Sequence, residues 1–207
     1  IKLHKIKKSK SSSLLEILVN SKIYKFKINN NLLSSIDNIL ASLAVLKSLM
    51  LIDKLNVNFF STYKIPIGRG NINKIIFDNK IINILDESYN SNPLSLKFSI
   101  NKFNNLQIDP KKKILLLGDM LELGKFSKKL HIEAAEAINK SKFSKLYVYG
   151  KDIRYTFNKI RTQNRGRILN SEEDIVKFLR NDLNDKDYLM IKGSNSTGLN
   201  KIIKRLT

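Results

Sequence analysis

Alternating apolar and polar positions open the chain, and helical periodicity follows them. Residues 14–19 and 23–28 predict two strands, the second of which alternates apolar with polar positions. Turn-forming residues separate the two runs, so a β-hairpin is predicted. Apolar side chains then recur at helical spacing over residues 36–49, and Ser34 or Ser35 is available as the N-cap of this helix.

A break in regular structure divides the chain in its first half. A shorter helix is predicted over residues 53–60. The segment 66–70, Pro-Ile-Gly-Arg-Gly, then ends regular structure, because proline and glycine favour turns. We therefore place a domain boundary near residue 72, which separates residues 1–72 from residues 73–207.

Beyond the boundary, short apolar runs alternate with helical stretches. Strands are predicted at residues 74–77, 81–85, 113–117, 145–149, 167–169 and 188–192. Helices are predicted after Pro93 and over residues 128–140, 152–160, 171–182 and 198–206, with Ser171 and Asp174 as a capping box. This order predicts an α/β fold with a Rossmann-like, doubly wound and mostly parallel sheet.

The composition excludes several classes of protein. The chain has no Cys, which excludes disulfides and thiolate metal sites and fits a cytoplasmic location. No apolar run reaches the roughly 20 residues that span a bilayer, and no signal peptide is recognisable, so membrane insertion is not expected. Residue 1 is Ile rather than Met, which we interpret as a start within a longer protein.

The formal net charge of +20 makes nucleic-acid binding an alternative function. However, only seven of the 38 basic residues are arginine, the side chain that reads bases and grips phosphate. The lysines are spread along the whole chain, and runs of Asn and Ile show the same bias at uncharged positions. We interpret the charge as compositional bias and expect no specific nucleic-acid partner.

Polar clusters follow three of the predicted strands directly, at residues 86–93, 118–124 and 192–196. Because ligands bind at the carboxyl ends of strands in open α/β sheets, we expect these loops to converge on one cleft. The loops offer carboxylates, amides, an ammonium and a phenol, but neither His nor Cys, so no catalytic dyad or zinc site is predicted there. His4 and His131 lie far apart in the sequence and are expected to be ordinary surface or helix residues.

These clusters, in this order and spacing, resemble the Mur ligase family of ATP-dependent amide-bond ligases. Within the family they resemble the branch that adds D-alanyl-D-alanine to UDP-N-acetylmuramoyl-tripeptide. Residues 118–124, Gly-Asp-Met-Leu-Glu-Leu-Gly, are the most specific segment, because they set this branch apart from its sister enzymes. Residues 36–41 and 66–69 match the end of the family's central domain. The resemblance covers essentially the whole chain, and it implies that residues 1–72 are the tail of the central α/β ATPase domain and residues 73–207 the C-terminal domain.

The resemblance also implies a reaction in peptidoglycan precursor synthesis. ATP with Mg²⁺ would phosphorylate the terminal carboxylate of the UDP-linked tripeptide, and the amine of D-alanyl-D-alanine would attack the acyl phosphate. The family's phosphate loop, its carbamylated lysine and most magnesium ligands would lie upstream, and this sequence contains no Gly-Lys-Ser or Gly-Lys-Thr. We therefore expect a monomeric, cytoplasmic ligase portion that is inactive alone and holds no catalytic residue or metal ligand.

On the nucleotide side, the resemblance assigns Asn38 to adenine and Arg69 to the ATP phosphates. Ser34 replaces a histidine of the family pattern, so the packing of adenine is expected to differ. The nucleotide loop would contain Asp86, Glu87, Tyr89, Asn90 and Asn92. Either acidic residue would hold the ribose, since adjacent strand residues point to opposite faces, and Glu87 is favoured. Tyr89 is expected either to stack on the base or to pack in the core.

On the substrate side, the resemblance places Asp119, Glu122, Lys192 and Ser194 along the D-alanyl-D-alanine site. Complementary charge puts the dipeptide carboxylate at the Lys192 loop. It puts the dipeptide ammonium at residues 118–124, which carry Asp119 and Glu122 and are called the acidic loop below. Two alternatives stay open, in which Glu122 caps the next helix and Lys192 serves the phosphates or lies at the surface.

Two other functions compete with this interpretation. A Rossmann-type binding module would carry Gly-x-Gly-x-x-Gly after its first strand, where this chain has residues 86–93. A sister enzyme, such as a folylpolyglutamate synthase or another Mur ligase, is disfavoured by residues 118–124.

Overall fold

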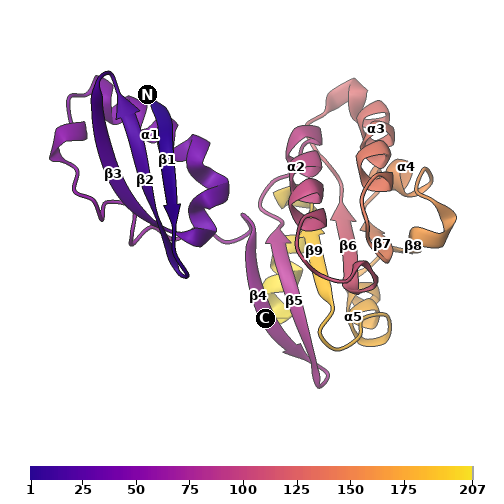
Figure 1. Ribbon diagram of the computed structural model, residues 1–207. Helices are drawn as coiled ribbons and strands as arrows, with labels where there is room; N and C mark the ends of the chain where they lie inside the picture. The colour runs from indigo at the N-terminus through magenta and orange to yellow at the C-terminus, as the bar shows by residue number, and fades with distance from the viewer. Residues whose placement is uncertain (207) are drawn as a thin grey trace. The chain divides into compact units, whose positions relative to one another are not determined.

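The computed structural model describes residues 1–206, apart from the side chains at positions 34, 71, 203, 204 and 206. The chain forms two compact units, residues 1–65 and residues 66–207, which run from indigo to yellow in Figure 1. The division falls directly before the Pro-Ile-Gly-Arg-Gly segment, which therefore belongs to the second unit. The assignment of residues 1–72 and 73–207 to two domains of the family stays a prediction.

The first unit is an antiparallel sheet of three strands followed by a helix. The strands are β1 (Lys2–Lys8), β2 (Ser12–Val19) and β3 (Lys22–Asn29), in the order β1-β2-β3. The predicted β2–β3 hairpin is confirmed, with Asn20 at a φ of 54° in its turn. A 3₁₀ turn, η1 (Asn30–Ser35), leads into α1 (Ile36–Ser48), whose Ile39 and Leu43 pack on the sheet.

The prediction of a helix over residues 53–60 is wrong. A single 3₁₀ turn, η2 (Ile52–Lys54), lies there, and turns follow it. The Val57 carbonyl accepts the Lys27 N–H of β3 at 2.6 Å, and the Asn58 N–H donates to the Asn56 side chain at 2.9 Å. These bonds take the place of the helical ladder, since Asn side chains compete with it for backbone groups.

The second unit contains a six-stranded sheet in the order β4-β5-β9-β6-β7-β8. Its strands are β4 (Asn71–Phe77), β5 (Lys80–Glu87), β6 (Lys113–Gly118), β7 (Lys145–Tyr149), β8 (Arg165–Leu169) and β9 (Tyr188–Lys192). β4 is antiparallel to β5, and the other pairs are parallel. The mostly parallel sheet is therefore confirmed, with one antiparallel strand at its edge.

Helices cover both faces of this sheet. α2 (Pro93–Asn104), α3 (Ser127–Asn139) and α4 (Ile153–Phe157) bury one face, while α5 (Glu172–Asn181) and α6 (Leu199–Leu206) bury the other (Figure 1). The chain steps in one direction from β5 to β6, β7 and β8, and then returns to β9. Because crossovers between parallel strands are right-handed, this return puts α5 on the opposite face. The predicted doubly wound architecture is confirmed.

Local caps explain where two of the helices begin. Asn92 and Ser95 form a reciprocal capping box at α2, with Pro93 at the first helical position. At α5, the Ser171 hydroxyl accepts the Asp174 N–H at 3.2 Å. The Asp174 carboxylate accepts the Asn170 N–H at 2.9 Å instead of the Ser171 N–H, so only the Ser171 half of the predicted capping box forms.

The position of β9 determines where the polar loops meet. β9 is the last strand in the chain, yet it lies between β5 and β6. The carboxyl ends of these three parallel strands are therefore neighbours at one edge of the sheet. No helix among residues 1–206 is long and apolar enough to span a membrane.

Candidate functional site

Ser194 joins the three loops that follow β5, β6 and β9. Its hydroxyl accepts the Leu121 N–H at 2.9 Å and donates to the Ser91 carbonyl at 3.2 Å. Its own N–H donates to the Asp119 carbonyl at 2.9 Å. Ser194 is buried, so these bonds are shielded from water. The loops expected to converge do lie together at one edge of the sheet.

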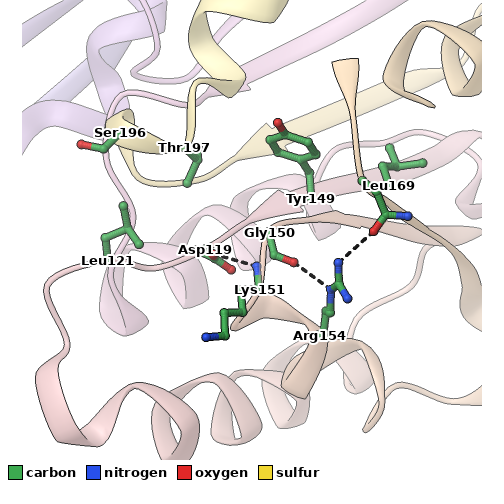
Figure 2. A pocket seen from close by; sticks show the side chains of 10 residues that line it. Asp119, Leu121, Tyr149, Gly150, Lys151, Arg154, Leu169, Ser196 and Thr197 are labelled. Atoms are coloured by element: carbon green, nitrogen blue, oxygen red, sulfur yellow. Dashed lines mark hydrogen bonds between the residues drawn. The ribbon is translucent and has the colours of Figure 1, made fainter. Parts of the chain in front are cut away.

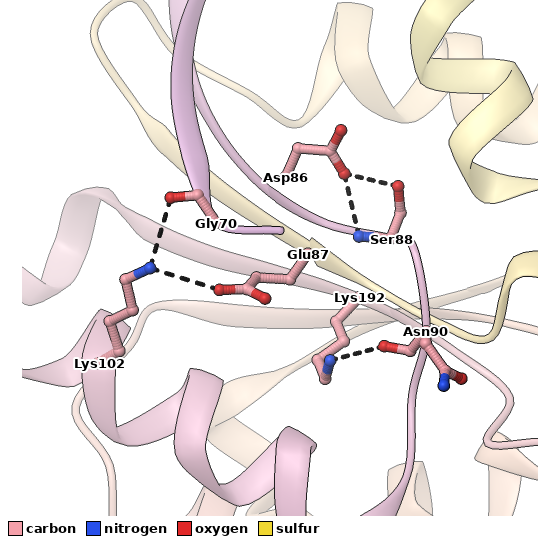
Figure 3. A network of polar contacts seen from close by, with 7 residues as sticks. All are labelled: Gly70, Asp86, Glu87, Ser88, Asn90, Lys102 and Lys192. Carbon is pink, nitrogen blue, oxygen red and sulfur yellow. Dashed lines mark hydrogen bonds and ion pairs between the residues drawn. The ribbon is translucent and has the colours of Figure 1, made fainter. Parts of the chain in front are cut away.

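Lys192 is buried at the end of β9, with 2% of its surface exposed. Its Nζ donates to the Asn90 carbonyl at 2.8 Å, which ties β9 to the loop after β5 (Figure 3). Burial lowers the pKa of the Lys192 ammonium, and the nearby Glu87 carboxylate opposes that shift. The alternative of a surface lysine is therefore wrong.

The adjacent acidic residues at the end of β5 have different partners. Asp86 is buried, and its Oδ1 accepts the N–H of Ser88 at 3.0 Å and the hydroxyl of Ser88 at 2.5 Å. Glu87 faces α2, where its Oε1 lies 3.5 Å from Lys102 Nζ. Lys102 also donates to the Gly70 carbonyl at 3.4 Å (Figure 3). Glu87 thus keeps a carboxylate near the 66–70 segment, whereas Asp86 is held by its own loop.

The 66–70 segment is pinned to the loop after β5. The Tyr89 N–H donates to the Gly68 carbonyl at 3.1 Å, and the Gly70 N–H donates to the Asp86 carbonyl at 2.7 Å. Gly68 has a φ of +80°, and a Cβ there would lie 2.9 Å from the Tyr89 nitrogen, so glycine is required. The Arg69 guanidinium carbon lies 4.3 Å from the centroid of the Tyr89 ring. Tyr89 is 47% exposed, which excludes the alternative that it packs in the core.

The two amides of this loop are used within the protein. Asn92 Oδ1 accepts the Ser95 N–H at 2.8 Å as the cap of α2. Asn90 Oδ1 accepts the Ser91 N–H at 2.7 Å. Asn38 belongs to the first unit, where it is exposed on α1 and its carbonyl accepts the Ser42 hydroxyl at 2.9 Å.

The acidic loop after β6 is held chiefly by Asp119. Its carboxylate accepts the Lys151 N–H at 3.0 Å and the Ile153 N–H at 2.7 Å, which fixes the start of α4. Glu122 is exposed and has a φ of +64°. The next two helices, η4 (Gly124–Phe126) and α3, have Leu123 and Phe126 at their N-cap positions, so the alternative that Glu122 caps them is wrong.

A cavity of about 340 Å³ with a mixed polar and apolar lining opens beside this loop, at the carboxyl ends of β6, β7 and β8. Its lining includes Asp119, Tyr149, Lys151, Arg154 and Thr197 (Figure 2). Asn170 also lines the cavity. Arg154 Nε donates to the Gly150 carbonyl at 3.0 Å, and its Nη2 donates to Asn170 Oδ1 at 2.8 Å. Two of its five N–H groups are thus used, and the guanidinium is held at the rim.

Sequence reasoning missed the cations of this cavity. Asp119 lines the cavity, whereas Glu122, Lys192 and Ser194 do not. The signal was present, because β7 ends at the same edge of the sheet and runs directly into Gly150-Lys151. The strand-end rule, applied to this fourth loop, would have selected Lys151 and Arg154.

Sequence reasoning also missed the burial of His131. It lies in α3 as expected, but it is fully buried rather than at the surface. Its spacing to Ala135 and Ile138, which share the buried face of α3, was the signal for burial. His4 is exposed on β1. No cluster of three or more metal-binding side chains occurs in the described part of the chain.

The family model of the Mur ligase glutamate ligase domain matches residues 74–195 of this chain. The chain is similar to a UDP-N-acetylmuramoyl-tripeptide–D-alanyl-D-alanine ligase of Buchnera aphidicola subsp. Acyrthosiphon pisum (strain APS), with 31% identity over 176 residues, 83% of this chain and 36% of the relative. The ligase of the same name from Bacillus subtilis (strain 168) is 28% identical over 128 residues, 60% of this chain and 28% of the relative. The chain thus spans about a third of the length of these curated relatives.

Two solved structures share the fold. The MurF ligase from Thermotoga maritima in complex with ADP has a TM-score of 0.70 at 22% identity, over 99% of this chain and 45% of that chain. A crystal structure of MurF from Acinetobacter baumannii has a TM-score of 0.72 at 16% identity, over 99% of this chain and 44% of that chain. At these identities the likeness concerns the fold alone.

Proposed function

We propose, from the premise that this chain belongs to the Mur ligase family, that it takes part in the ATP-dependent addition of D-alanyl-D-alanine to UDP-N-acetylmuramoyl-tripeptide. The reaction would pass through an acyl phosphate and serve peptidoglycan precursor synthesis. The chain would supply the side that closes on the nucleotide and the side that binds the dipeptide. Because it spans about a third of its relatives' length, we expect the chain alone to hydrolyse no ATP and form no amide.

The nucleotide side of this proposal rests on Arg69 and its neighbours. An exposed guanidinium stacked on an exposed aromatic ring fits a phosphate and a base, and the Glu87 carboxylate can accept from ribose hydroxyls. Bound ATP with Mg²⁺ would supply the phosphoryl group, with metal ligands from elsewhere in the enzyme. Asp86, Asn90 and Asn92 would shape the loop that carries Tyr89, through the bonds described above.

The observation that carries the proposal is the cationic cavity beside the loop of residues 118–124. A dipeptide with a free carboxylate needs a cation at one end of its site, and Arg154 offers its remaining N–H groups in a planar fork. Lys151 adds a second positive charge to the lining. Asp119 and Glu122 would place negative charge near the dipeptide ammonium, while Lys192 and Ser194 would hold the loops together.

Titration of the ¹⁵N-labelled chain with D-alanyl-D-alanine tests this assignment by NMR. Arg154→Ala should weaken binding by about 10-fold or more, because hydrogen bonds to charged groups are worth about 1.5–3 kcal/mol. Arg161→Ala, which removes an exposed arginine away from the cavity lining, is the matched control. Equal affinities for the two variants would contradict the site. Preferential binding of L-alanine or glutamate would instead assign the chain to a sister branch of the family.

A further inference from the structure

A buried histidine forms a hydrogen bond with the backbone of the acidic loop. His131 is fully buried in α3, and its Nε2 accepts the backbone N–H of Met120 at 3.1 Å. Its Nδ1 lies 2.8 Å from the Ser127 carbonyl, which can only accept, so Nδ1 carries the hydrogen. Both ring nitrogens therefore have defined roles, and only the neutral ring with its hydrogen on Nδ1 satisfies both partners.

Met120 lies between Asp119 and Leu121, the two residues that hydrogen-bond the loop to its neighbours. Asp119 accepts from the Lys151 and Ile153 N–H groups, and the Leu121 N–H donates to the Ser194 hydroxyl. Asp119, Leu121 and Lys151 all line the cavity. Met120 itself is 1% exposed, so its N–H has no access to water if His131 is lost.

The backbone of the same histidine also connects α3 to α4, the helix that carries Arg154. The Thr156 hydroxyl of α4 donates to the His131 carbonyl at 2.6 Å. The Ser127 hydroxyl donates to Asp152 at 2.5 Å, directly before α4 begins. One turn of α3 therefore holds both the acidic loop and the start of the helix that carries Arg154.

We propose that His131 is a positioning residue for the dipeptide cavity, acting through the Met120 backbone. The His131 ring fixes the backbone of the acidic loop at Met120. The loop in turn fixes the positions of Asp119 and Lys151 in the cavity lining. The ligand part of this inference rests on the proposed function; the loop part rests on the hydrogen bonds alone.

Two substitutions distinguish the role of His131 as a hydrogen-bond acceptor from its role in packing the core. His131→Gln keeps an oxygen at the reach of Nε2, whereas His131→Leu keeps the bulk without an acceptor. Thr156→Val is the control, because it removes a buried hydrogen bond to the His131 carbonyl and leaves the Met120 contact in place. Each variant is followed by amide exchange and amide shifts at Met120, Lys151 and Ile153, and by D-alanyl-D-alanine titration.

His131→Leu should accelerate amide exchange at Met120, move the Lys151 and Ile153 amide signals and weaken dipeptide binding by about 10-fold. His131→Gln should restore most of each effect. Thr156→Val should lower the Tm without accelerating amide exchange at Met120, because it leaves the bond from Met120 to the ring in place. The proposal is overturned if exchange at Met120 is no faster in His131→Leu than in Thr156→Val, or if His131→Gln does not restore the slow exchange.

The wild-type ring provides an independent readout if His131→Leu does not fold. Imidazole ¹⁵N shifts should show the hydrogen on Nδ1, and a ring protonated at Nε2 would overturn the proposal. If the wild-type chain binds no dipeptide, the proposed function fails, while the amide signals still decide whether His131 positions the loop.

Discussion

The guanidinium of Arg69 lies over the ring of Tyr89, with its central carbon 4.3 Å from the ring centroid. The arginine comes from the 66–70 segment and the tyrosine from the loop after β5, and two backbone hydrogen bonds fasten the segment to the loop. This contact restricts the orientation of the Arg69 guanidinium, which should reduce the entropy lost in the phosphate binding proposed for Arg69.

Removal of the Tyr89 ring should weaken nucleotide binding modestly. Tyr89→Leu is expected to lower the affinity of the chain for ADP by about 2–5-fold, since exposed cation–π contacts are worth about 0.5–1 kcal/mol. Tyr89→Phe should bind like the wild type, because the stack uses the ring and not the hydroxyl. Isothermal titration calorimetry measures both. A loss for Tyr89→Phe as large as that for Tyr89→Leu would show that the stack is not responsible.

Gly68 should tolerate no side chain. Gly68→Ala forces a Cβ to within 2.9 Å of the Tyr89 nitrogen at a φ of +80°, and we expect a loss of about 2–3 kcal/mol. Gly124→Ala is the control, because its φ is +53° but no atom lies within 4 Å of the added Cβ. It should cost about 1 kcal/mol. Urea unfolding followed by circular dichroism compares the two, and equal losses would rule out the clash.

Lys192 should make stability depend on pH. Its pKa in the folded chain is lowered from the ordinary 10.5, chiefly by burial. The charged ammonium therefore disfavours the fold at all pH values below the folded pKa, and this cost fades as pH rises through the folded pKa toward 10.5. The free energy of unfolding of the wild type, minus that of Lys192→Met, should thus increase from about pH 7 to about pH 9.5.

The control for this experiment is Lys177→Met, which removes a charge from an exposed position of α5. Urea unfolding of the three proteins at both pH values gives the two differences. If the difference in free energy of unfolding between the wild type and Lys192→Met is the same at both pH values, the Lys192 ammonium does not make stability depend on pH.

Duplex DNA should bind only through the net charge of +20. The complex is expected to be weak, indifferent to sequence and lost at about 0.2 M salt, because lysine–phosphate contacts depend on counterion release. Fluorescence anisotropy with two unrelated duplexes of equal length measures this. A complex with one duplex that survives this salt would support nucleic-acid recognition instead.

The sequence by itself determined the elements and the chemistry of the loops. Short apolar runs bounded by turn residues identified the strands of the second unit, since this signal is local. The polar clusters after β5, β6 and β9 could be located because parallel strands present their carboxyl ends at one edge. The pattern failed at residues 53–60, where a contact with β3 overrides local preference, and at β1, whose lysines obscure its alternation.

The tertiary structure alone decided which side chains are buried and which face the cavity. Lys192 is buried because β9 inserts between β5 and β6, and Tyr89 is exposed because the 66–70 segment holds its backbone. Arg154 reaches the cavity, and His131 reaches Met120, across contacts between separate elements. Such contacts depend on the order of strands and on the packing of helices over many residues, which no local periodicity encodes.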